Sequence, residues 1–272
     1  MTSAQSFVLG IVQGLTEFLP VSSTAHLRVL PFFLGWEDPG AAFSAAIQLG
    51  TLAAVFIYFA GDIKRLTAAA WEGLRLRDLS HSRDSLVAWA IIPGTLPIAV
   101  LGLGFRDFIE AEDGARGLSI VASALIGGAV MLLIAEKAGK RSRSMEGLGF
   151  WRIQFIGLCQ ALALIPGSSR SGVTIAGGLL AGLRRKEAAR FSFLLGLPAI
   201  AASGLLQLLE LMRGESGDLA SLAVGIAAAG VSGYLAIGFL LRFLERRGTH
   251  VFAAYRLALG AALMVMNFAW QG

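Results

Sequence analysis

Long apolar stretches separated by short polar connections run through most of this chain. Apolar stretches without a charged residue, each about 19 residues or longer, lie at 41–61, 86–105, 117–135, 191–209 and 219–241. A further apolar stretch, 251–270, contains one charged residue, Arg256. A helix needs about 20 apolar residues to cross a hydrocarbon layer of roughly 30 Å. The pattern therefore predicts an all-α polytopic membrane protein with six transmembrane helices.

Two segments break this pattern with polar side chains, and they resemble each other. They are GIVQGLTEFLPVSSTAH at 10–26, the first cluster, and GLCQALALIPGSSRSGVT at 157–174, the second cluster. Each has Gly, then Gln three residues later, an apolar stretch, Pro and a Ser-Ser pair. Together they hold Glu17, His26 and Arg170, and such ionisable groups are costly inside a bilayer. We expect the function to reside in these two clusters.

The composition agrees with a membrane protein. Hydrophobic residues make up 56% of the 272 residues, charged residues make up 15%, and the mean hydropathy is +0.70. The net charge of +5 raises nucleic-acid binding as an alternative. In a membrane protein, however, basic connections report topology, so we expect no nucleic-acid partner.

The charges of the connections predict their side of the membrane, because Lys and Arg collect on the cytoplasmic side. Lys and Arg collect in the connections 62–85, 137–152, 184–190 and 242–250. Acidic residues dominate the connections 106–116 and 210–218. We therefore place the basic connections inside and the acidic connections outside.

This assignment makes both polar clusters re-entrant. The segment 5–34 enters and leaves on the outer face, and the segment 153–183 enters and leaves on the inner face. The single membrane domain, 1–272, is then an inverted-topology repeat of 1–136 and 150–270, each with one re-entrant helix-loop-helix unit and three spanning helices. Broken helices in inverted repeats place a polar site near the membrane midplane, where the two tips are expected to meet.

The first cluster offers oxygen ligands and an acid–base group. Gln13 and Glu17 are four residues apart on a predicted helix that Pro20 disrupts, so both side chains lie on one face. A carboxylate and an amide carbonyl suit a hard divalent cation that shares ligands with phosphate. Ser23 and His26 are three residues apart, which places a hydroxyl near an imidazole. A purely structural role for the serine and the histidine stays open.

The second cluster offers groups that bind an anion. Arg170 is the only charged residue in 153–183, and its planar guanidinium matches phosphate oxygens. Ser169, Ser171 and Thr174 add hydroxyl donors, and the start of the next helix adds free backbone amides. An ion pair between Arg170 and Glu17 is compatible with this role, because a resting pair can open to admit a substrate.

The two clusters resemble the signatures of a known enzyme family. QGLTEFLPVSSTAH resembles the first signature of the BacA-type undecaprenyl-diphosphate phosphatases, and PGSSRSGVTIAGGLLAG resembles the second. The resemblance implies a multi-pass phosphatase of the bacterial inner membrane that removes the terminal phosphate of C55 isoprenyl diphosphate. This reaction recycles the lipid carrier for peptidoglycan synthesis, and abundant enzyme confers bacitracin resistance. The resemblance also implies a divalent cation, Mg²⁺ or Ca²⁺, and an active site facing the periplasmic side.

The family's functional residues carry over to this chain by motif position. They are Glu17, Ser23, His26, Ser169, Arg170 and Thr174. Gln13 departs from the commoner pattern, in which a first Glu stands at this position, and this favours Glu17 as the main metal-binding acid. The attacking group stays open between Ser23, water activated by His26, and His26 itself.

The chief alternative is a transporter or flippase for polyprenyl phosphate or phospholipid. Inverted repeats with facing broken helices are frequent in transporters, and Arg170 would bind a transported anion equally well. Transport needs no nucleophile or acid–base group, so the combination of Glu17, Ser23 and His26 favours the enzyme. The expected partners are undecaprenyl diphosphate and membrane lipids, and the sequence leaves a homodimer open.

Overall fold

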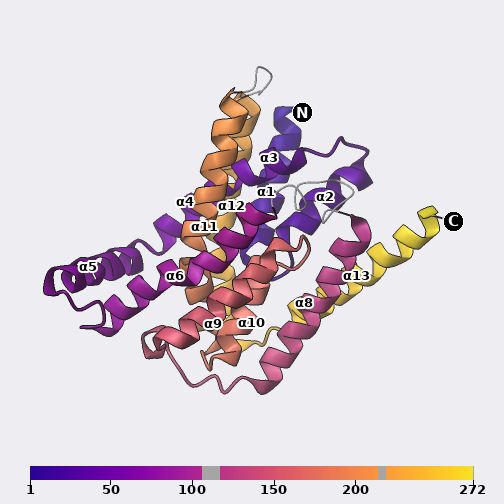
Figure 1. The fold of residues 1–272 in the computed structure, drawn as a ribbon. Helices are drawn as coiled ribbons and strands as arrows, with labels where there is room; N and C mark the ends of the chain where they lie inside the picture. Colours follow the sequence, from indigo (N-terminus) through magenta and orange to yellow (C-terminus); the bar gives the residue numbers. More distant parts are fainter. Residues whose placement is uncertain (106–116, 214–218, 272) are drawn as a thin grey trace.

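The described part of the chain is built from helices. A computed structural model describes residues 1–105, 117–213 and 219–271 (Figure 1). The longer helices in chain order are α1 Ser3–Phe18, α2 Ser23–Leu34, α3 Gly40–Ala46, α4 Gln48–Tyr58, α5 Ala60–Leu76, α6 Arg83–Gly104, α8 Leu118–Ala138, α9 Phe150–Ala161, α10 Arg170–Leu180, α11 Arg185–Arg213, α12 Leu219–Arg246 and α13 His250–Gln271. Two short 3₁₀ helices, η1 Met145–Gly147 and η2 Leu162–Leu164, flank α9.

Five of these helices are long and apolar enough to cross a membrane. They are α6, α8, the Arg185–Leu206 part of α11, α12 and the His250–Phe268 part of α13. Each coincides with a predicted apolar stretch, so the prediction of a polytopic all-α membrane protein is confirmed at this level.

The predicted spanning helix at 41–61 is not one straight helix. α3 and α4 meet at Ile47, and the pair Ala42–Tyr58 and Ala60–Leu76 is bent by 77°. Counting this bent pair as one span gives up to six candidate spans among the described residues. The bend separates the apolar α4 from α5, whose sequence carries several charges.

Helices from the two halves of the chain pack closely against each other. α1 packs along α12, and α9 packs along α6. Small residues permit this approach: a Cβ atom on Gly10 would lie 2.4 Å from the backbone oxygen of Gly225. Likewise, a Cβ atom on Gly157 would lie 2.1 Å from the backbone oxygen of Gly94. Close contact through small residues is the usual way in which membrane helices associate.

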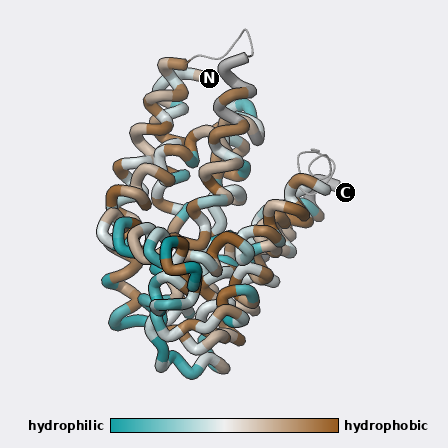
Figure 2. The backbone as a smooth tube through the Cα atoms, turned by 60° about the vertical axis from the view of Figure 1, so that its left-hand side comes forward, coloured by the Kyte–Doolittle hydropathy of each residue, from teal (hydrophilic) through white to brown (hydrophobic). Residues whose placement is uncertain are grey.

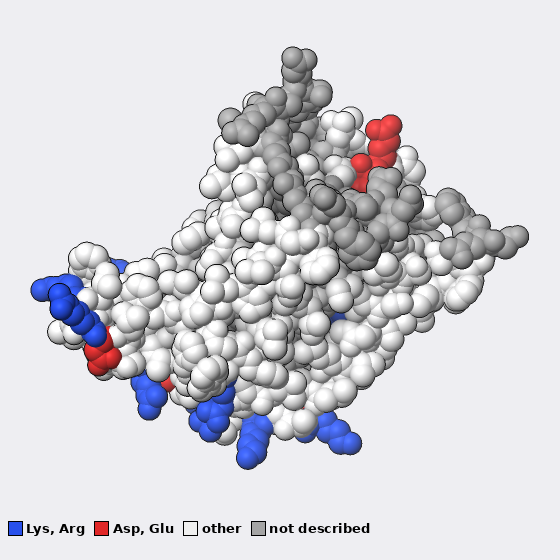
Figure 3. Space-filling view, viewed as in Figure 1, with Lys and Arg blue, Asp and Glu red and all other residues white. Residues whose placement is uncertain are grey.

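Basic side chains gather at one end of the molecule. Lys and Arg lie along its lower edge in Figure 3, and hydrophilic segments lie at the same end in Figure 2. Buried Glu136 of α8 accepts hydrogen bonds there from Arg141 at 2.7 Å, from Arg185 and from the Thr249 hydroxyl at 2.9 Å. These contacts connect α8 with the starts of α11 and α13. Of the predicted acidic connections, 106–116 and most of 210–218 lie outside the described residues.

Candidate active site

Both polar clusters form a helix, a break and a second helix. After the breaks, α2 and α10 begin with serine caps: Ser22 accepts a hydrogen bond from the Ala25 amide, and Ser169 accepts one from the Gly172 amide at 3.1 Å. Both cap residues have positive φ angles, 76° for Ser22 and 66° for Ser169. This conformation is costly for a non-glycine residue and persists where the surroundings enforce it. The two breaks therefore share an unusual local geometry.

Glu17 joins the two clusters. Its side chain is buried at the end of α1, with 7% of the residue exposed. One carboxylate oxygen accepts hydrogen bonds from Gln13 at 3.0 Å and from the Ser23 hydroxyl at 2.7 Å. The other accepts a hydrogen bond from Arg170 Nη2 at 3.0 Å, which pairs the buried charges. The predicted face shared by Gln13 and Glu17 is confirmed, and the expected meeting of Glu17 with Arg170 is present.

Two buried polar atoms beside this ion pair have no hydrogen-bond partner within the described ranges. They are the acceptor Oε1 of Gln13 and the donor Nη1 of Arg170. Buried polar atoms are normally satisfied, so these two atoms leave an acceptor and a donor with unused hydrogen-bonding capacity in one site. The donor suits an anion, and the amide oxygen suits a cation or a water molecule.

The guanidinium of Arg170 lies against the backbone of α11. A Cβ atom on Gly196 would lie only 1.5 Å from Arg170 Nη1. No residue larger than glycine fits there without moving the arginine. Gly196 is thus a residue of the site that the two sequence motifs do not contain.

The predicted hydroxyl donors of the second cluster face different surroundings. Ser169 lines the cavity described below together with Arg170. The Ser171 hydroxyl donates to the backbone oxygen of Leu19 at 3.2 Å, and the fully buried Thr174 donates to the backbone oxygen of Arg170 at 2.7 Å. Ser171 and Thr174 therefore contact protein groups beside the cavity, and their role in binding a diphosphate stays a prediction.

His26 forms its hydrogen bonds with groups other than Ser23. Its Nδ1 lies 2.7 Å from the backbone oxygen of Ser22, and its Nε2 lies 2.6 Å from the hydroxyl of Tyr255 on α13. A carbonyl oxygen only accepts, so these contacts assign the proton to Nδ1 and leave Nε2 to accept from the tyrosine. The Ser23 hydroxyl and the imidazole, which the sequence places near each other, are not hydrogen-bonded to each other in this structure. The buried carboxylate of Glu17, a stronger acceptor than a neutral imidazole, takes the serine hydroxyl instead.

A cavity of about 410 Å³ opens from this site. Its polar end is formed by Glu17, Ser22, Ser23, Ser169 and Arg170. The rest is lined mainly by apolar residues of α6, η2 and α11, namely Ile98, Ala99, Leu103, Ala163, Leu164, Ala199, Ile200, Ala202 and Leu206. We call it the amphipathic cavity, because it suits a ligand with a charged head and an apolar tail.

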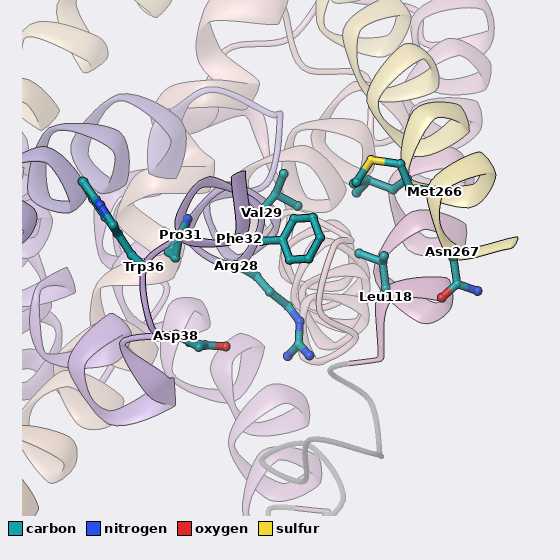
Figure 4. Close-up of a pocket in the computed structure, with 10 residues that line it drawn as sticks. Arg28, Val29, Pro31, Phe32, Trp36, Asp38, Leu118, Met266 and Asn267 are labelled. Carbon is teal, nitrogen blue, oxygen red and sulfur yellow. The ribbon is translucent and has the colours of Figure 1, made fainter. Parts of the chain in front are cut away.

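A second cavity of about 550 Å³ lies between α2 and the ends of α8 and α13 (Figure 4). We call it the Arg28 cavity. Phe32 points toward Leu118 and Met266 across it, and Arg28 is the cation in its lining. It contains none of the residues that the two clusters predict for chemistry. Although it is the larger cavity, we therefore place the candidate active site in the amphipathic cavity.

The protein supplies few metal ligands in this site. Across the described ranges, no group of three or more His, Cys, Asp or Glu side chains is arranged to hold a metal ion. Glu17 and the unused Oε1 of Gln13 provide two oxygen ligands of the type that Mg²⁺ and Ca²⁺ prefer. These residues fit a divalent cation that takes its other ligands from phosphate and water.

Two functional candidates come from α13 and were not predicted as site residues. Tyr255 contacts His26, and the neighbouring Arg256 is fully buried. Arg256 is visible in the sequence as the one charge in an apolar stretch, which is a signal for function inside a membrane. Tyr255 carries no comparable signal, because its contact spans 229 residues.

Comparison with known proteins identifies the family. The family described as "Bacitracin resistance protein BacA" matches residues 6–262. The undecaprenyl-diphosphatase of Chlorobium phaeobacteroides (strain BS1) is 48% identical over 274 residues, covering 97% of this chain and 96% of that protein. Two more proteins of the same name are each 49% identical to this chain over 98% of its length. The match covers 97% of the protein from Chlorobaculum tepidum and 89% of the protein from Myxococcus xanthus (strain DK1622). The chain therefore belongs to the BacA family.

Proposed function

We propose that this protein is a membrane phosphatase that hydrolyses undecaprenyl diphosphate to undecaprenyl phosphate and inorganic phosphate. The observation that carries the proposal is the amphipathic cavity, in which Glu17 and Arg170 lie beside a mainly apolar lining. The name and near full-length similarity of the relatives support the same activity. The product returns to peptidoglycan synthesis, and the family name connects this activity with bacitracin resistance.

The polar end of the cavity binds the diphosphate, and the apolar part holds the start of the isoprenyl tail. Arg170 Nη1 is a buried donor without a partner within the described ranges, so a phosphate oxygen completes its hydrogen bonding. Ser169 lies next to it on the cavity wall. Fixed donors aimed at the phosphate stabilise the charge that shifts onto oxygen in the transition state.

The contact between Ser23 and Glu17 favours Ser23 as the attacking group. The serine hydroxyl already donates to the carboxylate at 2.7 Å, so Glu17 can take its proton. The serine oxygen bonds to the terminal phosphorus while the bond from that phosphorus to the bridging oxygen breaks, and undecaprenyl phosphate leaves. Water then cleaves the phosphoserine, restores Ser23 and releases inorganic phosphate, and the proton held by Glu17 leaves with the products.

Attack by His26, or by water that His26 activates, is the alternative route. Both versions require the imidazole to leave Tyr255, because its Nε2 is engaged by that hydroxyl at 2.6 Å. Trapping of a phosphorylated protein decides between the routes. Mass spectrometry of rapidly quenched enzyme is expected to find phosphate on Ser23. Phosphate on His26, or on neither residue, would contradict the route through Ser23.

A divalent cation, Mg²⁺ or Ca²⁺, completes the proposed site. Glu17 would hold it, with the unused Oε1 of Gln13 as a second protein ligand. When bound, such an ion neutralises negative charge on the phosphate oxygens. Gln13 contributes an oxygen but no charge, so the site carries one protein carboxylate for the cation.

We further propose that the two clusters are re-entrant and that the chain is an inverted repeat in the bacterial inner membrane, with the active site open to the outer face. The packing of α1 along α12 and of α9 along α6 is the reciprocal pattern that such a repeat produces. The matching serine caps with positive φ support the same relation. The basic end of the molecule is then cytoplasmic (Figure 3).

Cysteine labelling in cells tests this topology. In a background lacking Cys159, cysteines at Asp78 and Ser144 are expected to react only with reagents that enter the cytoplasm. A cysteine at the exposed Glu37 is expected to react with an impermeant reagent from outside. Labelling of position 144 by the impermeant reagent would contradict the inverted arrangement.

Hydrolysis is tested with purified protein in detergent. Undecaprenyl diphosphate is supplied with Mg²⁺ or Ca²⁺, and both inorganic phosphate and the lipid product are measured. We expect equal amounts of phosphate and undecaprenyl phosphate, and loss of both with a chelator or in Arg170→Ala. A transporter without enzymatic activity would release no phosphate.

A further inference from the structure

Arg256 is a buried cation that contacts several helices and both breaks. It lies on α13, and its side chain is fully shielded from solvent. Every hydrogen bond that it makes within the described ranges goes to a backbone carbonyl oxygen. These are Leu125 at 3.1 Å, Ala124 at 3.2 Å, Gly167 at 3.2 Å, Ser168 at 2.8 Å and Pro20 at 3.4 Å. No carboxylate in the described ranges pairs with it, so its positive charge is balanced only by carbonyl dipoles.

A buried charge without a counter-ion is costly, and a membrane protein that contains one usually uses it. A methionine or leucine would fill comparable volume in this apolar helix at no electrostatic cost. The distinctive property of arginine here is its five N–H donors in a fixed fork, which can hold several carbonyls at once.

The carbonyls that Arg256 holds belong to both breaks. Pro20 lies just before the Ser22 cap of the first cluster, and Gly167 and Ser168 lie just before the Ser169 cap of the second. In the part of the chain that the structure describes, no other side chain from outside the two clusters hydrogen-bonds the backbone of both. The other two carbonyls, of Ala124 and Leu125, belong to α8, so Arg256 also connects both breaks to this helix.

We propose that Arg256 is a positioning residue of the phosphatase reaction. It fixes the two breaks relative to each other, so that Glu17 and Ser23 from one meet Arg170 from the other. Its unneutralised charge also attracts the diphosphate, although it contacts backbone rather than substrate. The proposal rests on the phosphatase function proposed above.

Two glycines provide the space through which the guanidinium reaches the breaks. A Cβ atom on Gly128 of α8 would lie 2.0 Å from Arg256 Nη2, and one on Gly172 would lie 2.6 Å from Nη1. Gly127 is adjacent on the same helix, and a Cβ atom there would meet nothing within 4 Å. Gly128→Ala therefore displaces the guanidinium, and Gly127→Ala is its matched control.

The test compares Arg256→Lys, Arg256→Gln, Gly128→Ala and Gly127→Ala with the wild type. Each protein is purified in detergent, checked for folding by Tm and monodispersity, and assayed for phosphate release from undecaprenyl diphosphate. Arg256→Lys keeps the charge but loses most of the hydrogen bonds, so we expect kcat to fall about tenfold or more with KM within about threefold of wild type. Arg256→Gln loses the charge as well, so its KM is expected to rise together with the fall in kcat.

Gly128→Ala is expected to lower kcat about tenfold or more without loss of Tm, and Gly127→Ala is expected to match the wild type. Wild-type kcat in Arg256→Lys, or equal kcat in the two glycine variants, overturns the proposal. The proposal is also overturned if each variant loses activity only in proportion to its loss of folded protein, because Arg256 then has a purely structural role. If the wild type itself releases no phosphate, the phosphatase function fails rather than the role of Arg256.

Discussion

Gly196→Ala tests whether the position of Arg170 controls the reaction. The substitution adds a single methyl group to α11, outside both polar clusters. Its Cβ atom would lie 1.5 Å from Arg170 Nη1 and 2.7 Å from Cζ. Ordinary contact between such atoms needs about 3.5 Å, so the guanidinium has to move by about 2 Å. The hydrogen bond of 3.0 Å from Arg170 to Glu17 does not survive such a movement.

The expected cost follows from this displacement. A misplacement of about 1 Å in a catalytic arrangement can lower the rate about 10²-fold, so kcat/KM is expected to fall about 10²-fold or more. This loss corresponds to about 2.7 kcal/mol of transition-state stabilisation. In a helix interior, alanine is favoured over glycine by about 0.5–1 kcal/mol, so helix propensity gives no reason for lower stability.

The assay is the rate of phosphate release from undecaprenyl diphosphate at several substrate concentrations, with Tm measured on the same samples. Gly127→Ala on α8 controls for the exchange of glycine by alanine, because a Cβ atom there meets nothing within 4 Å. A kcat/KM within about threefold of wild type in Gly196→Ala would refute the role that we assign to the placement of Arg170. Equal losses in the two variants would refute it as well.

Further predictions concern single side chains of the site. Arg170→Lys is expected to fold and to lose about 10²-fold in kcat/KM, because a point charge cannot replace a planar fork, and near-normal kinetics would remove this role. Glu17→Gln is expected to lower the rate about 10²-fold even with excess Mg²⁺ or Ca²⁺, because an amide cannot take the Ser23 proton, and full rescue by excess metal would leave Glu17 only a metal ligand. His26→Ala is expected to keep the rate within about tenfold of wild type, because Ser23 and Glu17 carry the attack, and a loss of about 10²-fold would favour the alternative route through His26. Tyr255→Phe is expected to keep turnover within about threefold of wild type, like the control Tyr234→Phe, because the route through Ser23 does not use the imidazole, and faster turnover in Tyr255→Phe would favour the route through His26.

Local spacing in the sequence predicts the parts of the molecule that depend on local geometry. About 20 uncharged residues are sufficient to form a spanning helix, which is why the five described helices that are long and apolar enough to cross a membrane coincide with predicted apolar stretches. The four-residue spacing of Gln13 and Glu17 fixes one helix face, and their side chains are hydrogen-bonded at 3.0 Å.

The same reasoning fails where several acceptors compete for one donor. A spacing of three residues allows Ser23 to face His26, but it does not say whether another acceptor lies closer. Glu17, six residues before the serine and across the break, takes the hydroxyl instead. The helix break determines this outcome, and no helical periodicity describes the chain through it.

Contacts between distant segments also escape sequence reasoning. Gly196 looks like any other glycine of an apolar helix until Arg170 is seen against it. Tyr255 contacts His26 across 229 residues, and Arg256 reaches carbonyls of both breaks. These roles depend on how the helices pack together, which residue types and local spacing do not specify.

The central claim is that the diphosphate binds where Glu17 and Arg170 meet. An experimental structure with a non-hydrolysable methylene-bisphosphonate analogue of undecaprenyl diphosphate tests it most directly. We predict that the terminal phosphonate lies within hydrogen-bond distance of Arg170 Nη1 and beside Ser23, with the tail between α6 and α11. An analogue whose phosphonates lie in the Arg28 cavity, away from Glu17 and Arg170, would contradict the account.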